Sequence, residues 1–161
     1  MPNHLRRAAS GILPLALIAL LAAAPARAQT EKIDRVRAFL IWEESGDLSK
    51  NVVGSTPRIE ANGPKGMSSQ IIVDIIVSGP KNTMPKGQLI LYASADRDQD
   101  KGARPMVDVG WPITYFSAKG ETVRSLIVDH MCQPFTLSVR VGRGNAMGRI
   151  METKFPIFCG D

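Results

Sequence analysis

Apolar and polar residues alternate along much of the chain, in the pattern expected for β-strands. The alternation is strict over 135–141, where every second residue from Phe135 onward is apolar, and it is equally regular over 107–115. A period of two is typical of a strand with one buried face. Segments 71–77 and 89–93 are denser in apolar residues, which indicates strands in the middle of a sheet.

The other expected strands are shorter or interrupted. Proline cannot donate a backbone hydrogen bond to a neighbouring strand, so Pro112 and Pro156 predict strands that are edges or bulged. No stretch after residue 28 keeps a helical period for three turns. We therefore expect an all-β fold, a single antiparallel β-sandwich of seven or eight strands. The further strands in this count lie at 36–42, 52–53, 123–131 and 149–158.

Residues 1–28 have the three parts of a secretory signal peptide. A basic start precedes an apolar run over 12–24, and Ala26-Arg27-Ala28 supplies the small-x-small cleavage site. The run is shorter than the roughly 20 residues of a membrane-spanning helix, so a retained anchor is the lesser alternative. We expect one domain over 29–161, periplasmic or secreted, without an integral membrane span. The Arg6-Arg7 pair leaves twin-arginine export open beside general secretion.

Cleavage also changes the charge of the chain. The full sequence carries 20 Lys and Arg against 15 Asp and Glu, a formal charge of +5. Three of the basic residues, Arg6, Arg7 and Arg27, precede the cleavage site, so the mature chain has 17 basic and 15 acidic residues, or +2. Nucleic-acid binding requires a concentrated basic face, and so small a charge does not predict one. We expect no nucleic-acid partner.

Both cysteines, Cys132 and Cys159, lie in the mature chain. An even count in an exported protein favours a disulfide over free or metal-bound thiols. The expected strands at 135–141 and 149–158 form a hairpin, in which the end of the second strand returns beside the start of the first. The hairpin therefore brings the two cysteines within reach of each other.

Few residues could support catalysis. His130 is the only histidine after the signal peptide, so metal sites built on two or three imidazoles are excluded. Asp129 precedes it directly, and neighbouring strand residues point to opposite faces, so the two cannot pair as in a catalytic triad without a bulge. No Gly-x-Ser-x-Gly motif occurs. We expect no catalytic residue and no enzymatic activity, with an unrecognised hydrolase as the alternative.

Acidic residues at alternate positions form one candidate metal site. Asp96, Asp98 and Asp100 alternate before Gly102, and Asp108 follows. Carboxylates spaced in this way can turn toward one hard cation, and calcium takes about six to eight oxygen ligands. The spacing departs by one residue from that of the twelve-residue calcium loop, and basic neighbours oppose a cation. A solvated loop is the simpler interpretation, so we expect no cofactor, with calcium as the alternative.

Methionines and aromatic residues leave two further possibilities. His130-Met131 lies directly before Cys132, and thioethers bind reduced copper, so a periplasmic copper carrier is a second metal alternative. The methionines are scattered, however, and methionine commonly fills gaps in cores. The aromatic residues could line a binding face or fill the core of a sandwich. The methionines are Met67, Met84, Met106, Met131, Met147 and Met151, and the aromatic residues are Trp42, Tyr92, Trp111, Tyr115 and Phe116.

Three segments resemble small exported β-sandwich proteins of bacteria. The run from Phe39 to Val52, FLIWEESGDLSKNV, is similar to their opening strand and loop, and 87–91 and 132–137 fit the same layout. The resemblance extends over most of the mature chain. It implies an immunoglobulin-like or C2-like sandwich of uncharacterised role, and it transfers no catalytic residue to this chain.

Taken together, these features favour a non-catalytic exported binding module. Its partner would be an unknown protein or small ligand in the periplasm. A metal-dependent module, with calcium or copper, and an unrecognised hydrolase are the alternatives from other functional classes.

Overall fold

A computed structural model describes residues 30–54, 57–98 and 104–160. The expected signal peptide, residues 1–28, lies outside the described residues, and so does Asp100. Within these ranges the regular secondary structure is entirely β-strand, as the alternation predicts. The same ranges contain no helix long and apolar enough to cross a membrane.

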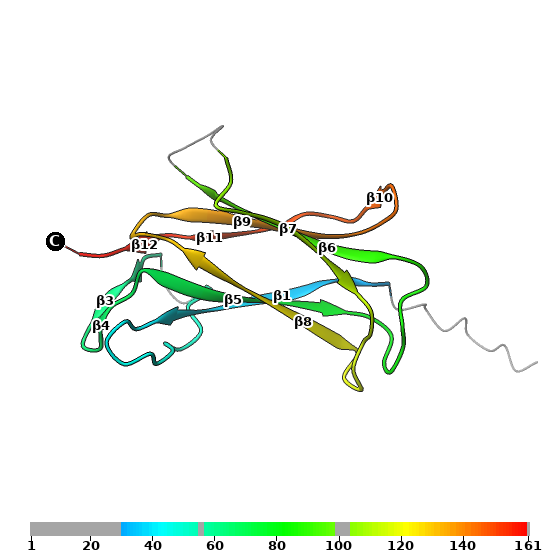
Figure 1. The fold of residues 1–161 in the computed structure, drawn as a ribbon, viewed down its shortest axis with the longest axis horizontal. Helices are drawn as coiled ribbons and strands as arrows, with labels where there is room; N and C mark the ends of the chain where they lie inside the picture. Colours follow the sequence, from blue (N-terminus) through cyan, green and yellow to red (C-terminus); the bar gives the residue numbers. More distant parts are fainter. Residues whose placement is uncertain (1–29, 55–56, 99–103, 161) are drawn as a thin grey trace, which may run out of the picture.

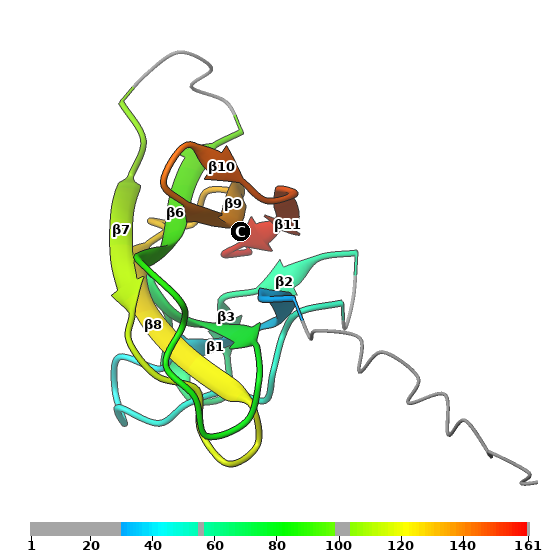
Figure 2. The same cartoon turned by 90° about the vertical axis from the view of Figure 1, so that its right-hand side faces the viewer.

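The longer strands form two sheets that lie face to face as two layers (Figure 1, Figure 2). The smaller sheet has the order β1-β5-β8. In the larger sheet β6 lies between β7 and β9, and both β10 and β11 pair with β9. The smaller sheet consists of β1 (Lys32–Ile41), β5 (Gln70–Ser78) and β8 (Glu121–Asp129). The larger consists of β6 (Leu89–Arg97), β7 (Val107–Ile113), β9 (Phe135–Arg143), β10 (Ala146–Met147) and β11 (Met151–Phe155).

Apolar side chains from alternate positions fill the space between the sheets. On β9, Phe135, Leu137 and Val139 are fully buried, and on the facing sheet Val73 of β5 is buried as completely. Phe135 also stacks on Phe155 of β11, with ring centroids 4.7 Å apart. Burying one such side chain stabilises the fold by about 1.5 to 3 kcal/mol. This shared core makes the arrangement compatible with a β-sandwich.

Two small pairings complete the fold. β3 (Asn62–Gly63) and β4 (Gly66–Met67) form a tight hairpin, whereas β12 (Ile157–Phe158) pairs with β2 (Ile59–Glu60) in parallel. The parallel pairing departs from the expected all-antiparallel arrangement. Pro156 cannot continue the hydrogen-bonded ladder of β11, and its carbonyl instead accepts from the backbone N–H of Ile59 (2.9 Å). The chain therefore leaves the larger sheet at this proline.

The predicted positions of the central and edge strands are confirmed. β5 and β6 each have a neighbour on both sides, and β7, which contains Pro112, is an edge strand. β6 continues to Arg97, beyond the end expected from its apolar residues, because its backbone pairs with β9 as far as Phe135. Pro156 separates β11 from β12, as an interrupting proline predicts.

The expected strand at 52–53 is wrong, because side chains along this segment take over the hydrogen bonds of a strand. The backbone N–H of Ala38 donates to Asn51 Oδ1 (2.9 Å), and the Ala38 carbonyl accepts from Val52 N (2.9 Å). Nearby, Ser49 Oγ accepts from the backbone N–H of Leu40 (2.9 Å). The segment thus covers this part of the edge of β1 without forming a ladder of its own.

The edges of β7 and β8 are also obstructed. Pro112 lacks an N–H, and Arg124 of β8 donates to the Pro112 carbonyl (3.1 Å). Arg124 lies at the same side of β8 as the buried Leu126. Inward-pointing charges and prolines on edge strands disfavour pairing with another chain. The outer faces of the two sheets are therefore better surfaces for a partner than these edges.

Candidate functional site

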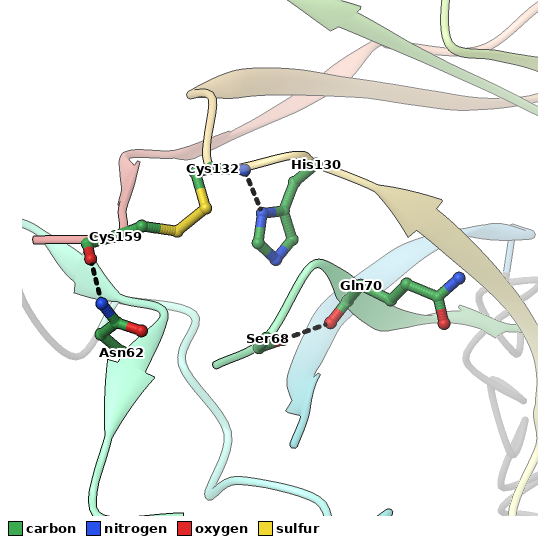
Figure 3. The surroundings of a disulfide bond; sticks show 6 residues. All are labelled: Asn62, Ser68, Gln70, His130, Cys132 and Cys159. Atoms are coloured by element: carbon green, nitrogen blue, oxygen red, sulfur yellow. Dashed lines mark hydrogen bonds between the residues drawn. A yellow bond between two sulfur atoms is a disulfide. The ribbon is translucent and has the colours of Figure 1, made fainter. Parts of the chain in front are cut away.

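The predicted disulfide between Cys132 and Cys159 is confirmed (Figure 3). It joins the β8–β9 connection to the end of β12, and the two Cα atoms lie 5.4 Å apart. The β9–β11 hairpin produces this proximity, because Phe155 pairs with Phe135. Asn62 donates a side-chain hydrogen bond to the Cys159 carbonyl and ties the β3–β4 hairpin to the same region (Figure 3).

His130 lies beside the disulfide and is fully buried. Its Nδ1 accepts a hydrogen bond from the backbone N–H of Cys132 (3.0 Å), so the neutral ring carries its proton on Nε2. Within the described ranges Nε2 has no hydrogen-bond partner. Burial lowers the pKa of His130 to about 4, against the opposing effect of the Asp129 and Glu43 carboxylates. The imidazole is therefore neutral at pH 7.

The backbone beside this histidine is strained. Met131 and Cys132 have φ angles of 49° and 61°, in the left-handed region that non-glycine residues rarely adopt. Such a conformation costs about 1 to 2 kcal/mol per residue. The Cys132–His130 hydrogen bond and a second one from Gln133 N to the His130 carbonyl (2.8 Å) hold the turn in place. His130 thus has a structural role in this turn, and Asp129 points away from it and accepts from Gln70 Nε2 (2.7 Å).

The structure brings together two of the four aspartates of the candidate calcium site. Asp96 is the penultimate residue of β6 and Asp108 lies on the neighbouring β7, on the same outer face of the larger sheet. Asp98 Oδ1 instead accepts from Thr136 Oγ1 (2.8 Å), and Asp100 lies outside the described residues. No group of three or more His, Cys, Asp or Glu side chains in the described ranges is placed to hold a metal ion. Any cation here would have two described carboxylates as ligands.

Asp96 and Asp108 line a shallow hollow of about 290 Å³ on the outer face of the larger sheet. Asp108 lies directly opposite Ser94 of β6, and Ser94 lies opposite Ser138 of β9, so a carboxylate and two hydroxyls form one row across three strands. Ser94 Oγ donates to Asp96 Oδ2 (3.2 Å). Among the described residues neither aspartate has an ion-pair partner. We call this hollow, lined by Tyr92, Ser94, Asp96, Asp108, Ser138 and Arg140, the polar depression.

Tyr92 forms the other end of the polar depression. Its ring lies against two glycines on the adjacent strands: a Cβ at Gly110 would lie 3.5 Å from ring atom Cδ1, and a Cβ at Gly142 would lie 3.4 Å from Cε2, which are ordinary van der Waals distances. The guanidinium carbon of Arg140 is 5.7 Å from the ring centroid, within the range of a cation–π interaction. The polar depression therefore combines an aromatic ring and a cation with carboxylates and hydroxyls.

The other residues considered for binding divide between core and surface. Phe116 is fully buried, and Trp42 and Trp111 pack against the core, as expected of a sandwich, whereas Tyr115 is exposed. The expectation that methionines fill the core holds for Met106 and Met151 alone. It is wrong for four methionines that are exposed on four separate segments, Met67, Met84, Met131 and Met147.

Sequence reasoning identified Asp96 and Asp108 and named Tyr92 among the aromatic residues that could line a binding face, but it missed Ser94, Ser138 and Arg140. The available signal was the alternation over 135–141, which places Ser138 and Arg140 on the side away from the core. Alternation does not reveal which strands are neighbours, and the depression requires side chains from three of them.

The chain matches no protein-family model, and no curated protein matches it in sequence. The geometry of the chain itself is therefore the basis for assigning a function.

Proposed function

We propose that this chain is an exported, immunoglobulin-like domain that binds a ligand without catalysing a reaction. The strand order supports the fold. Immunoglobulin-type sandwiches place strands A, B and E in one sheet and C, F and G in the other. Here β1, β5 and β8 occupy the first set of positions, β6, β9 and β11 the second, and β7 extends the second sheet beside β6.

Two features support export and the absence of catalysis. Residues 1–28 have the composition of a signal peptide, and the Cys132–Cys159 disulfide is of a kind that persists in the periplasm or outside the cell. The single candidate base, His130, is enclosed, and its Nδ1 is engaged by a backbone N–H. It is therefore poorly placed to activate a nucleophile for the hydrolase alternative.

The polar depression is the observation that carries the binding proposal. Its carboxylates, Asp96 and Asp108, lack ion-pair partners among the described residues, so they are available to hydrogen-bond donors of a ligand. Hydrogen bonds to ionised carboxylates are stronger than neutral ones. A volume of about 290 Å³ suits a small molecule. We propose a small ligand that is rich in O–H or N–H groups and rests against Tyr92.

Nuclear magnetic resonance of the ¹⁵N-labelled exported protein tests this proposal. With a panel of sugars, polyols and polyamines, at least one compound is expected to shift the amide signals of Ser94, Asp108 and Ser138. Asp108→Asn should weaken that binding about tenfold or more, because a charged hydrogen bond contributes about 1.5 to 3 kcal/mol. Glu60→Gln, which removes an exposed carboxylate from β2, is the matched control and should bind as the wild type does. Shifts confined to other surfaces, or full binding by Asp108→Asn, would refute the proposed site.

Calcium binding in the polar depression is the second candidate function, because Asp96 and Asp108 lie on one face. A bound ion at a hundredfold excess over its dissociation constant would add about 2.7 kcal/mol to stability. Two described carboxylates supply few of the six to eight oxygens that calcium takes. We therefore expect millimolar calcium to shift the melting temperature no further than magnesium does, and Asp98→Asn to leave that response unchanged. A calcium-specific rise that Asp96→Asn abolishes would establish the metal function instead.

A further inference from the structure

The outer face of the smaller sheet carries a row of apolar side chains that lie directly opposite one another. Phe39 on β1 pairs with Ile72 on β5, which pairs with Ile127 on β8. Ile127 is 57% exposed. Beside this row lies Ile41, and the half-exposed Leu48 is its partner in an isolated β-bridge. We call these five residues the apolar strip. The layer that carries it, β1-β5-β8, is the lower one in Figure 1.

The other central isoleucine on this face is covered by the chain itself. Arg35 of β1 and Glu121 of β8 form an ion pair (3.0 Å) that spans β5. Ile76 of β5, opposite Arg35, is only 1% exposed. Val123 of β8, opposite Ile76, is 42% exposed, so the apolar surface continues on that strand, and the guanidinium carbon of Arg37 lies 5.9 Å from the ring centroid of Phe39 at the border of the apolar strip. Contiguous exposed apolar residues with a polar border mark interaction surfaces.

Polar residues border the row on both sides. On one side Gln70 Nε2 donates to Asp129 Oδ1 (2.7 Å). On the other side Asp74 accepts from Arg37 (2.9 Å) and from Ser125 Oγ (2.7 Å). Gln70 and Asp74 are each two residues from Ile72 on the same strand, so an amide donor and a carboxylate acceptor lie symmetrically about the centre of the row.

We propose that the Phe39–Ile72–Ile127 row of the apolar strip packs on the same row of a second copy of this chain, about a twofold axis that passes at Ile72 and runs perpendicular to the strands. Ile41 then lies over Arg37 of the other copy, because the two residues are placed on opposite sides of the row. This axis lays Phe39, Ile72 and Ile127 of one copy over the same residues of the other. It also sets Gln70 of each copy against Asp74 of the other. The Gln70 amide has two N–H donors and, among the residues that the structure describes, donates one of them to Asp129, so the second is available to the opposing carboxylate.

The alternative twofold axis, parallel to the strands, matches this face less well. It would oppose Asp74 to Asp74 and Gln70 to Gln70, and like charges that face each other across an interface reduce affinity. A closed dimer requires a patch that is complementary to itself. The donor–acceptor symmetry about Ile72 meets this requirement, which favours a second copy over an unrelated protein as the occupant.

The dimer would leave the proposed ligand site open. The polar depression lies on the outer face of the larger sheet, away from the apolar strip, so the two copies would present their depressions on opposite sides of the assembly. Two identical sites on one particle strengthen binding to a ligand that is displayed in multiple copies. Dimerisation is independent of the ligand, so its test does not depend on the proposed function.

Sedimentation equilibrium of the exported protein tests the dimer. Three apolar side chains per copy meet across this axis and make a small interface, so we expect a dissociation constant on the order of 10 µM and a monomer–dimer equilibrium between about 1 and 300 µM. Ile127→Lys should weaken dimerisation at least about a hundredfold, because the axis brings the two lysines together. Ile150→Lys is the matched control: Ile150 is 49% exposed beside the polar depression, and its substitution should leave the equilibrium unchanged.

Cross-linking then tests the orientation of the two copies. In the proposed dimer Ile127 lies over Ile127, so Ile127→Cys should form a disulfide-linked dimer under mild oxidation, whereas the parallel axis places it over Phe39 of the other copy. This variant also keeps the proposal testable if the lysine variant fails to fold. A wild type that remains monomeric at about 300 µM, or an Ile127→Lys variant that dimerises as strongly as the wild type, overturns the proposal.

Discussion

Removing the disulfide with the double substitution Cys132→Ser and Cys159→Ser is expected to lower the free energy of unfolding by about 2 to 5 kcal/mol. The bridge joins residues 27 positions apart, and on the chain-entropy model a loop of this size contributes about 3.6 kcal/mol. The native state gives a second reason. The bridge anchors the chain end just after β12, whose pairing with β2 extends over only two residues. Urea denaturation of the two purified proteins, followed by circular dichroism, measures the difference.

The wild type with its disulfide reduced is the natural control for this experiment, and it should lose about the same stability as the double variant. Both proteins should retain a β-sheet spectrum in the absence of urea if the remaining core is sufficient to fold them. Thiol titration of unfolded, non-reduced wild type is expected to detect no free cysteine. A double variant as stable as the wild type would show that the β9–β11 hairpin and the core hold the chain end without the bridge.

Acidification is expected to destabilise the wild type through His130, and His130→Gln should remove that part of the effect. Burial lowers the folded-state pKa of His130 to about 4, from an ordinary value of 6.5. Between these two pKa values the unfolded chain binds a proton that the folded chain does not. The free energy of unfolding therefore falls as the pH drops from 6.5 toward 4, and the contribution of the neutral histidine is complete above pH 6.5. At about 1.4 kcal/mol per pH unit, the contribution lost is about 3 kcal/mol.

Measuring the free energy of unfolding of both proteins at several values between pH 7 and pH 4 tests this expectation. The carboxylates titrate in both proteins, so the difference between the two curves isolates the histidine. His130→Gln should be less stable at pH 7, because the new side chain fills the site less well. Its free energy of unfolding should, however, depend less on pH than that of the wild type. Parallel curves, or an imidazole NMR signal of the folded wild type that titrates near pH 6.5, would contradict a buried neutral histidine.

The strands and the bridge follow directly from the order of residues. A strand with one buried face must alternate, so the pattern over 135–141 predicts β9 and its buried residues, Phe135 among them. The disulfide is predicted from local features as well, because the end of a hairpin lies beside its start regardless of how the other strands are arranged. Pro112 predicts the edge position of β7 for an equally local reason, the absence of an N–H.

Only the tertiary structure decided which residues meet across strands. The row of Asp108, Ser94 and Ser138 and the row of Phe39, Ile72 and Ile127 each combine side chains from three separate strands. Alternation assigns a side chain to a face, but the neighbours on that face depend on strand order and register, which are set by how all the strands bury their apolar sides together.

The same dependence on distant contacts explains why the strand at 52–53 and the all-antiparallel arrangement were wrongly predicted, and why His130 is buried and neutral. The segment 52–53 has strand-like residues, yet the side chain of Asn51 and its neighbours already provide the hydrogen bonds that this edge of β1 requires. After Pro156, the chain pairs in parallel with β2. His130 follows a strand in a segment of ordinary polarity, and the packing around the disulfide encloses it. Sequence by itself thus determined the strands, their buried faces and the bridge, because these depend on local periodicity and chain connectivity. Strand order, the two outer surfaces and the protonation of the buried histidine depend on contacts between distant segments, and the folded structure alone decides them.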